Sequence, residues 1–125
     1  MGQNVCLDTD VVIAILNNEE RALNVINFIH SSEIFITVIT LFELLLRETN
    51  LDKIEVFRNH VKILDFDETA SRKASLILKE LKKTGKIIEF RDLFIASICI
   101  TNNCELATFN KRHFERIGEL NLGDF

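Results

Sequence analysis

The chain has 125 residues, of which 47% are hydrophobic and 27% charged, and its formal net charge is −4. This length predicts a single domain over residues 1–125 with material for one apolar core. No apolar run approaches the ~20 residues that a membrane-spanning helix needs, and the acidic balance does not favour a general nucleic-acid-binding surface. The start of the chain lacks the basic and apolar regions of a secretory signal, which predicts a cytoplasmic protein.

The first half of the chain alternates between short apolar segments and segments with helical spacing. In chain order, we expect a strand at 4–8, helices at about 10–17 and 22–29, a strand at 34–37, and helices at 38–46 and 51–59. The first strand ends on Asp8, and the leucine-rich helix at 38–46 contains a single carboxylate, Glu43.

The second half continues this alternation and contains the clearest helix. In chain order, we expect a strand at 61–66, helices at 67–85 and 89–101, a strand at 105–108, a short helical turn at 110–116 and an edge strand at 121–122. In the helix at 67–85, Asp67 is the predicted N-cap and Gly85 stands where a C-terminal cap belongs. Asp92 lies near the start of the next helix.

Short apolar strands that alternate with helices predict an α/β fold. The expected architecture has three layers, α/β/α, with a central parallel sheet of four to five short strands. Ligands of such sheets bind at the carboxyl ends of the strands. Asp8 and Asn110 lie just past predicted strand ends, and Glu43 and Asp92 lie on helices near the same edge, so these four residues form one candidate site.

Each carboxylate also has a purely structural interpretation. Glu43 lies on a helix that is apolar nearly all round, and burying an unpaired carboxylate costs several kcal/mol, so it must pair with Arg or Lys, face solvent, or bind a cation. Asp8 and Asp92 stand where Asp commonly caps a helix. Together the three favour a metal site, because Mg²⁺ prefers oxygen ligands and converging carboxylates repel one another without a cation.

The remaining polar residues give weaker indications. Basic residues concentrate at Lys79, Lys82, Lys83, Lys86, Arg91, Lys111 and Arg112. A solvated helix face is the favoured interpretation of the lysines, and contact with phosphates is the alternative. The three cysteines, Cys6, Cys99 and Cys104, lack the spacing of a zinc site and are predicted to be core thiols.

The opening motif allows one alternative family. Residues 5–12, with Asp8 and Asp10, resemble the Asp-x-Asp motif of haloacid-dehalogenase-like phosphohydrolases. In that family the first Asp is a nucleophile and the second a general acid. The family also needs a lysine and an acidic pair after a late strand, whereas the late strand here leads into Thr108 and Asn110.

A second resemblance extends along nearly the whole chain. Residues 8–13, 37–44, 92–96 and 108–114 are similar, in this order, to the four motifs of PIN-domain nucleases. This resemblance implies a PIN-like fold and Mg²⁺- or Mn²⁺-dependent cleavage of single-stranded RNA. It makes Asp8, Glu43 and Asp92 the metal-binding acids and places Asn110 at the fourth position.

A PIN-like chain this short looks most like the VapC-type toxins of toxin–antitoxin pairs. That resemblance implies a homodimer that is neutralised by a small antitoxin protein. His113 stands where the family often has a further Asp, and Glu89 is a candidate for an extra carboxylate, so the site could hold one or two metal ions. A PIN-like module that binds RNA or a protein without cleaving is a further alternative.

Overall fold

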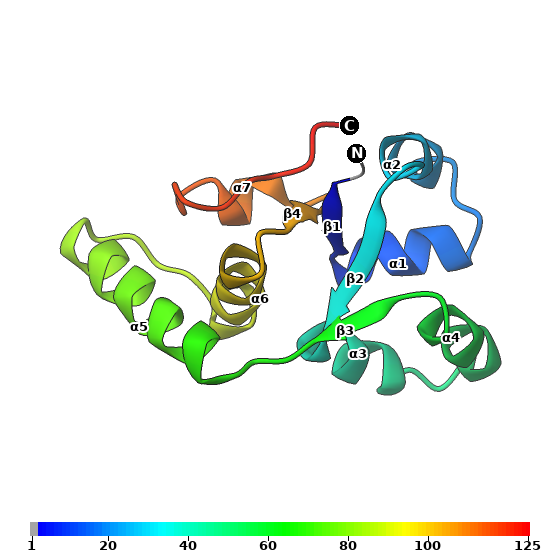
Figure 1. Cartoon of the computed structure of the whole chain (residues 1–125), viewed down its shortest axis with the longest axis horizontal. Helices are drawn as coiled ribbons and strands as arrows, with labels where there is room; N and C mark the ends of the chain where they lie inside the picture. The colour runs from blue at the N-terminus through cyan, green and yellow to red at the C-terminus, as the bar shows by residue number, and fades with distance from the viewer. Residues whose placement is uncertain (1–2) are drawn as a thin grey trace.

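A four-stranded parallel β-sheet, in the order β3-β2-β1-β4, lies at the centre of the computed structural model, which describes residues 3–125. The strands are β1 (Asn4–Leu7), β2 (Glu33–Thr37), β3 (Lys62–Leu64) and β4 (Glu105–Ala107). β1 lies between β2 and β4 (Figure 1). Because the strands are parallel, their carboxyl ends meet at one edge of the sheet.

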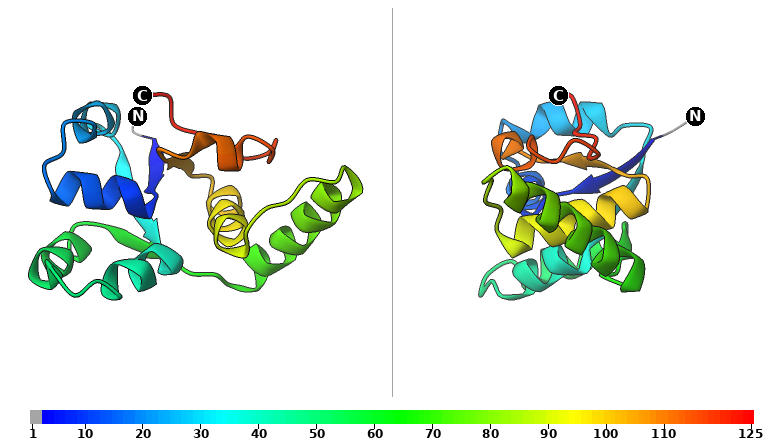
Figure 2. Two further views of the ribbon diagram at one scale, coloured as in Figure 1. Left: turned by 180° about the vertical axis from the view of Figure 1, so that it is seen from behind. Right: turned by 90° about the vertical axis from the view of Figure 1, so that its left-hand side faces the viewer.

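Helices cover both faces of this sheet (Figures 1 and 2). One layer contains α1 (Thr9–Leu16), α2 (Ala22–Phe28), α3 (Val38–Leu45) and α4 (Leu51–Arg58), and the other contains α5 (Glu68–Lys83), α6 (Phe90–Thr101) and α7 (Lys111–Phe114). The predicted three-layer α/β/α fold with a central parallel sheet is therefore confirmed. Within residues 3–125, no helix combines the length and the apolar character needed to cross a membrane.

Side chains of β1 alternate between two apolar cores. Val5 and Leu7 are buried on the side of α1, where they join Val11. Cys6 points the other way and is buried with residues of α5 and α6 such as Ala96. A strand that is buried on both faces must be apolar at nearly every position, which is why residues 4–7 show no alternation of polar and apolar residues.

Helix α5 begins and ends as its capping residues predict. The Asp67 carboxylate accepts a hydrogen bond from the Ala70 N–H (2.9 Å). At the other end, Gly85 has a φ of 70°, which a side chain would disfavour. The Lys86 N–H then donates to the Leu81 carbonyl (2.9 Å), as in a Schellman motif.

Two strands are shorter than the predicted segments at 61–66 and 105–108. Leu64 ends β3 opposite the last residue of β2, and Ala107 ends β4 opposite the last residue of β1. A strand cannot extend the ladder beyond the end of its neighbour. A sequence pattern describes one segment alone, so it cannot predict where a neighbouring strand ends the pairing.

The C-terminal segment also differs from the prediction. The expected edge strand at 121–122 is an isolated bridge between Leu122 and Leu106 of β4. The Gly123 N–H donates to the Leu106 carbonyl (2.9 Å), so the segment lies beside β4 without forming a longer strand. The predicted turn at 110–116 is the short helix α7.

The three cysteines are free, buried thiols, as predicted. Contact with Cys6, together with burial, raises the pKa of Cys99 well above its usual value. Burial raises the pKa of Cys104 to about 12. Because the thiolate is the form that binds metals, these shifts do not favour a cysteine metal site.

Candidate active site

Asp8 lies where β1 ends and α1 begins, at the carboxyl edge of the sheet. Its N–H donates to the Ala107 carbonyl (2.9 Å), which holds this residue against β4. Its Oδ1 accepts from the Thr9 N–H (2.8 Å), and its Oδ2 accepts from the Thr108 hydroxyl (2.8 Å). The side chain is 1% exposed. Asp8 therefore caps α1 and also presents a buried carboxylate at this edge.

Glu43 reaches the same edge from α3. This helix follows β2 directly, and the Thr37 hydroxyl caps it by accepting from the Thr40 N–H (3.1 Å). The cap fixes where the helix starts, which places Glu43 in its second turn. There, the Thr9 hydroxyl donates to Glu43 Oε1 at 2.5 Å. Thr9, the first residue of α1, thus connects Glu43 of α3 to the residues around Asp8.

Asp92 enters the site from the first turn of α6. The helix starts after Glu89, and no side chain caps it. Asp92 thus stands in the first turn, where an acid is expected, but it does not cap the helix: its Oδ1 accepts from Arg91 Nη1 (2.8 Å). Its Oδ2 lies 3.5 Å from Nδ1 of His113 on α7. The Asp92 side chain is 7% exposed.

The guanidinium of Arg91 lies between the three carboxylates and binds all of them. Nη2 donates to Asp8 Oδ1 (2.7 Å) and to Glu43 Oε1 (2.9 Å), and Nε donates to Glu43 Oε2 (2.7 Å). Together with the bond to Asp92, these contacts define the acid cluster, formed by Asp8, Glu43 and Asp92 around one cation. For Glu43, the structure realises the ion pair that was one of its predicted alternatives.

The role of Arg91 is the main feature of the site that the sequence did not reveal. The sequence placed Arg91 only among the basic residues of the second half, for which contact with phosphates was the functional alternative. The available clue was Glu43: a carboxylate on an apolar helix needs a cation. Arg91 stands next to the third candidate acid, but only the folded chain brings it to the first two.

The charges of the acid cluster stabilise one another. Burial alone would raise the pKa of Glu43, but hydrogen bonds from Arg91 and Thr9 and the charge of Arg91 lower it below 4.5. Burial alone would lower the pKa of Arg91, but its bonds to Glu43, Asp8 and Asp92 raise it above its usual value. The Glu43 carboxylate is therefore held in its ionised form, which is the form that binds metal ions.

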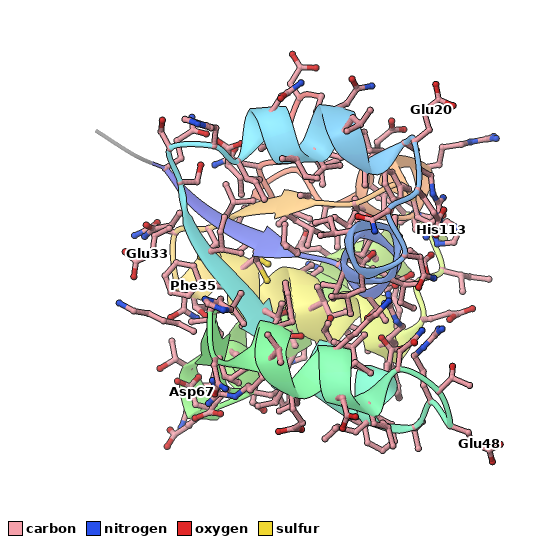
Figure 3. The ribbon with its side chains drawn as sticks, turned by 90° about the vertical axis from the view of Figure 1, so that its right-hand side faces the viewer. Glu20, Glu33, Phe35, Glu48, Asp67 and His113 are labelled. Carbon is pink, nitrogen blue, oxygen red and sulfur yellow. The ribbon has the colours of Figure 1, made fainter. Side chains whose placement is uncertain are left out.

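A pocket of about 290 Å³ opens onto the acid cluster. It is lined by Thr9, Asp10, Glu43, Glu89, Arg91, Asp92, Asn110 and His113. Figure 3 shows His113 on the side of the molecule toward which β1 and β4 point, opposite Glu33 at the start of β2. All four predicted site residues belong to this edge. Glu43, Asp92 and Asn110 line the pocket, and Asp8 bonds to Arg91 in its lining.

Asn110 also lines the pocket, and its side chain bonds to Asp10. Its N–H donates to the Thr108 hydroxyl (3.0 Å), and its Nδ2 donates to Asp10 Oδ2 (3.2 Å). Thr108 also donates to Asp8, so Asn110 is linked to the cluster through one hydroxyl. His113 and Glu89 line the same pocket.

The acid cluster has the composition of a divalent-cation site. Its donors are carboxylate oxygens, which Mg²⁺ and Mn²⁺ prefer, and they already surround one positive charge. The guanidinium lies between them, and within residues 3–125 no three His, Cys, Asp or Glu side chains are close enough together to hold a metal ion in this arrangement. The carboxylate oxygens are therefore the right kind of ligand for the ion, but in this structure they surround Arg91.

The phosphohydrolase alternative requires a different pair of acids, Asp8 and Asp10. Asp10 is exposed on α1, and its carboxylate accepts from Asn110. The carboxylates that converge with Asp8 on one cation are those of Glu43 and Asp92. This arrangement does not favour a phosphohydrolase.

Similarity to known proteins covers nearly the whole chain. Residues 5–120 match the family model of the PIN domain. The chain is 29% identical over 126 residues to the tRNA(fMet)-specific endonuclease VapC of Shigella flexneri, a match that covers 95% of this chain and 96% of that protein. It is 38% identical over 95 residues to ribonuclease VapC3 of Methanocaldococcus jannaschii, covering 74% and 94%.

Similarity to solved structures also covers nearly the whole chain. VapBC2 from Rickettsia felis, in a crystal structure bound to a DNA fragment from its promoter, matches with a TM-score of 0.85 and 27% identity over 98% of this chain and 99% of that one. The DNA-bound VapBC of Salmonella typhimurium matches with a TM-score of 0.82 and 30% identity, covering 99% and 98%. The chain belongs to the PIN-domain family and is a member of its VapC type.

Proposed function

We propose that this chain is a divalent-metal-dependent endoribonuclease that cleaves single-stranded RNA and acts as the toxin of a toxin–antitoxin pair. The observation that carries the proposal is the acid cluster, in which carboxylates from the end of β1, from α3 and from α6 converge on one cation at the carboxyl edge of the sheet. The relatives named as a tRNA-specific endonuclease and as a ribonuclease support the choice of substrate.

In this proposal, Asp8, Glu43 and Asp92 hold the ion, and neighbouring hydroxyls fix the orientation of Asp8 and Glu43. Thr108 donates to Asp8, and Thr9 donates to Glu43, so each carboxylate keeps one oxygen in a defined position. When bound, Mg²⁺ or Mn²⁺ would polarise the attacking water and neutralise charge that develops on the phosphodiester. Asn110 lines the pocket, where its amide can orient the water or the phosphate.

The proposed partners are a small antitoxin protein and a second copy of the chain. The VapBC structures of Rickettsia felis and Salmonella typhimurium support the antitoxin. The exposed face of α3 supports a homodimer, because Phe42, Leu45 and Leu46 are spaced to share one side of the helix and are all exposed. We propose that the chain acts in the cytoplasm, where its RNA substrate is found.

Replacing Asp8 with Asn tests the proposed activity. The purified chain is expected to cleave single-stranded RNA with Mg²⁺ or Mn²⁺ and to lose this activity in excess EDTA. We expect Asp8→Asn to lower the rate by at least about 100-fold, because it removes a charge that would face the ion. Asp52→Asn, on the exposed surface of α4, is the matched control and should retain full activity.

Expression of the chain in cells tests the proposed role as a toxin. Expression of the unmodified chain should arrest growth, Asp8→Asn should not, and a small neighbouring reading frame should relieve the arrest. Equal cleavage by Asp8→Asn, or cleavage in excess EDTA, would contradict the proposed mechanism. RNA binding without cleavage would identify a non-catalytic module instead. Light scattering on the purified chain measures whether it is a dimer.

A further inference from the structure

Arg91 supplies the positive charge that holds the acid cluster together in this structure. It forms two parallel bonds with Glu43 and single bonds with Asp8 and Asp92, so its planar fork engages all three carboxylates at once. Such charge-assisted bonds are about twice as strong as neutral ones. The guanidinium therefore occupies the position between the acids.

The oxygens that a metal ion would need are the ones that Arg91 binds. Both Glu43 oxygens, Asp8 Oδ1 and Asp92 Oδ1 accept from it at 2.7–2.9 Å. Mg²⁺ requires its oxygen ligands at roughly 2.0–2.1 Å from one central ion. The carboxylates are thus too widely spaced for a metal ion as they stand. A guanidinium and a divalent ion among the same oxygens would also repel each other.

The side chain of Arg91 lies outside the apolar packing of the fold, so its departure would leave that packing intact. It belongs to neither apolar core, and its side chain is 28% exposed. Its backbone lies in the first turn of α6, next to the pocket that opens onto the cluster. Two further carboxylates, Asp10 and Glu89, line that pocket and can receive the guanidinium outside the cluster.

We propose that Arg91 is an internal competitor of the metal ion. It neutralises the acid cluster when no metal is bound and leaves it when a divalent ion binds. This inference rests on the proposed metal-dependent function and adds an inhibitory contact within the chain itself. The metal must displace the guanidinium before the site can act, so Arg91 sets the metal concentration at which the site becomes occupied.

Calorimetric titration with Mn²⁺ tests the competition. Arg91→Met keeps much of the side chain but cannot bind the carboxylates, and we expect it to bind Mn²⁺ about tenfold more tightly than the unmodified chain. Arg91→Lys keeps the charge but loses the fork, so it should also bind more tightly, by a smaller factor. If net charge alone mattered, Arg91→Lys would bind like the unmodified chain. Arg72→Met, which removes an exposed charge on α5, is the control and should change the affinity by less than about twofold.

A second measurement follows Arg91 in the unmodified chain. In ¹⁵N-edited NMR spectra of the metal-free chain, the Arg91 Nε–H should be protected from exchange, because it donates to Glu43. Saturating Mg²⁺ should move this signal to the position and fast exchange of an exposed arginine. Arg91→Met is used only to assign the signal, and if it does not fold, Arg91→Lys replaces it.

The outcomes separate this inference from the proposed function. Tighter Mn²⁺ binding by both Arg91 variants, with release of the Nε–H on adding Mg²⁺, supports the competition. Equal or weaker binding by folded Arg91→Met, or an unchanged Nε–H signal at saturating Mg²⁺, overturns the competition and leaves the nuclease proposal standing. Absence of Mn²⁺ binding by every form overturns both.

Discussion

The carboxylate of Glu43 makes the stability of the metal-free chain depend on pH. Its pKa in the folded chain lies below 4.5, so the folded state favours the ionised form more than the unfolded state does. This contribution to stability is complete above pH 4.5 and is lost as the pH falls through the lower folded-state pKa. In EDTA, the free energy of unfolding measured in urea should therefore decrease below pH 4.5, and the decrease should be smaller for Glu43→Gln.

Glu20→Gln is the matched control for this pH dependence. Glu20 is exposed just before the start of α2 (Figure 3), so its replacement should leave the pH profile unchanged. If the profiles of Glu43→Gln and the unmodified chain are parallel between pH 3 and 6, the hydrogen bonds from Arg91 and Thr9 do not stabilise the ionised carboxylate.

At the scale of single residues, the sequence identified the acids but not the cation. Glu43 is unexpected on an apolar helix, but Asp8 and Asp92 stand where Asp commonly caps a helix, so only the ordered similarity to the PIN-domain motifs singled out all three. Arg91 was not predictable, because a basic residue at the start of a helix is ordinary in sequence. Its importance depends on how β1, α3 and α6 converge, and that convergence is a property of the tertiary structure. The catalytic roles of the acids remain predictions.

At the scale of elements, the N-cap of α5 is a measurable source of stability. The Asp67 carboxylate binds an N–H in the first turn, which would otherwise lack a partner. Replacing Asp67 with Ala should lower the free energy of unfolding by about 1 kcal/mol. Asp67→Ser keeps an oxygen that can accept the same bond and should stay within a few tenths of a kcal/mol of the unmodified chain.

Urea unfolding followed by circular dichroism measures both variants. An equal loss in Asp67→Ala and Asp67→Ser would mean that the charge of the residue matters and the cap does not. Cleavage of RNA should be the same in both, because α5 contributes no residue to the pocket at the acid cluster.

Helix α5 also illustrates why elements were easier to predict than their lengths. Its cap, its apolar face and its terminal glycine all lie within one segment, so both ends of the helix can be predicted from that segment alone. The ends of β3 and β4 are set by where β2 and β1 stop, and those limits lie elsewhere in the chain. The expected strands at 61–66 and 105–108 were too long for this reason.

At the scale of the whole molecule, the acid cluster connects the two helical layers through the sheet. Glu43 comes from α3 in one layer, Asp92 from α6 in the other, and Asp8 from the end of the central strand β1. An ion that binds this cluster binds only the folded chain, because unfolding separates the three carboxylates. Metal binding should therefore stabilise the entire fold and not one layer alone.

Adding Mn²⁺ should accordingly raise the free energy of unfolding while the transition remains single. At a free Mn²⁺ concentration 100 times the Kd, the expected gain over EDTA is about 2.7 kcal/mol. The double variant Asp8→Asn, Asp92→Asn should show no gain, whereas Asp52→Asn should gain as much as the unmodified chain. Urea unfolding followed by circular dichroism measures each case. A gain that persisted in the double variant would mean that Mn²⁺ stabilises the fold from another place, because two of the three carboxylates that converge on Arg91 would no longer carry charge.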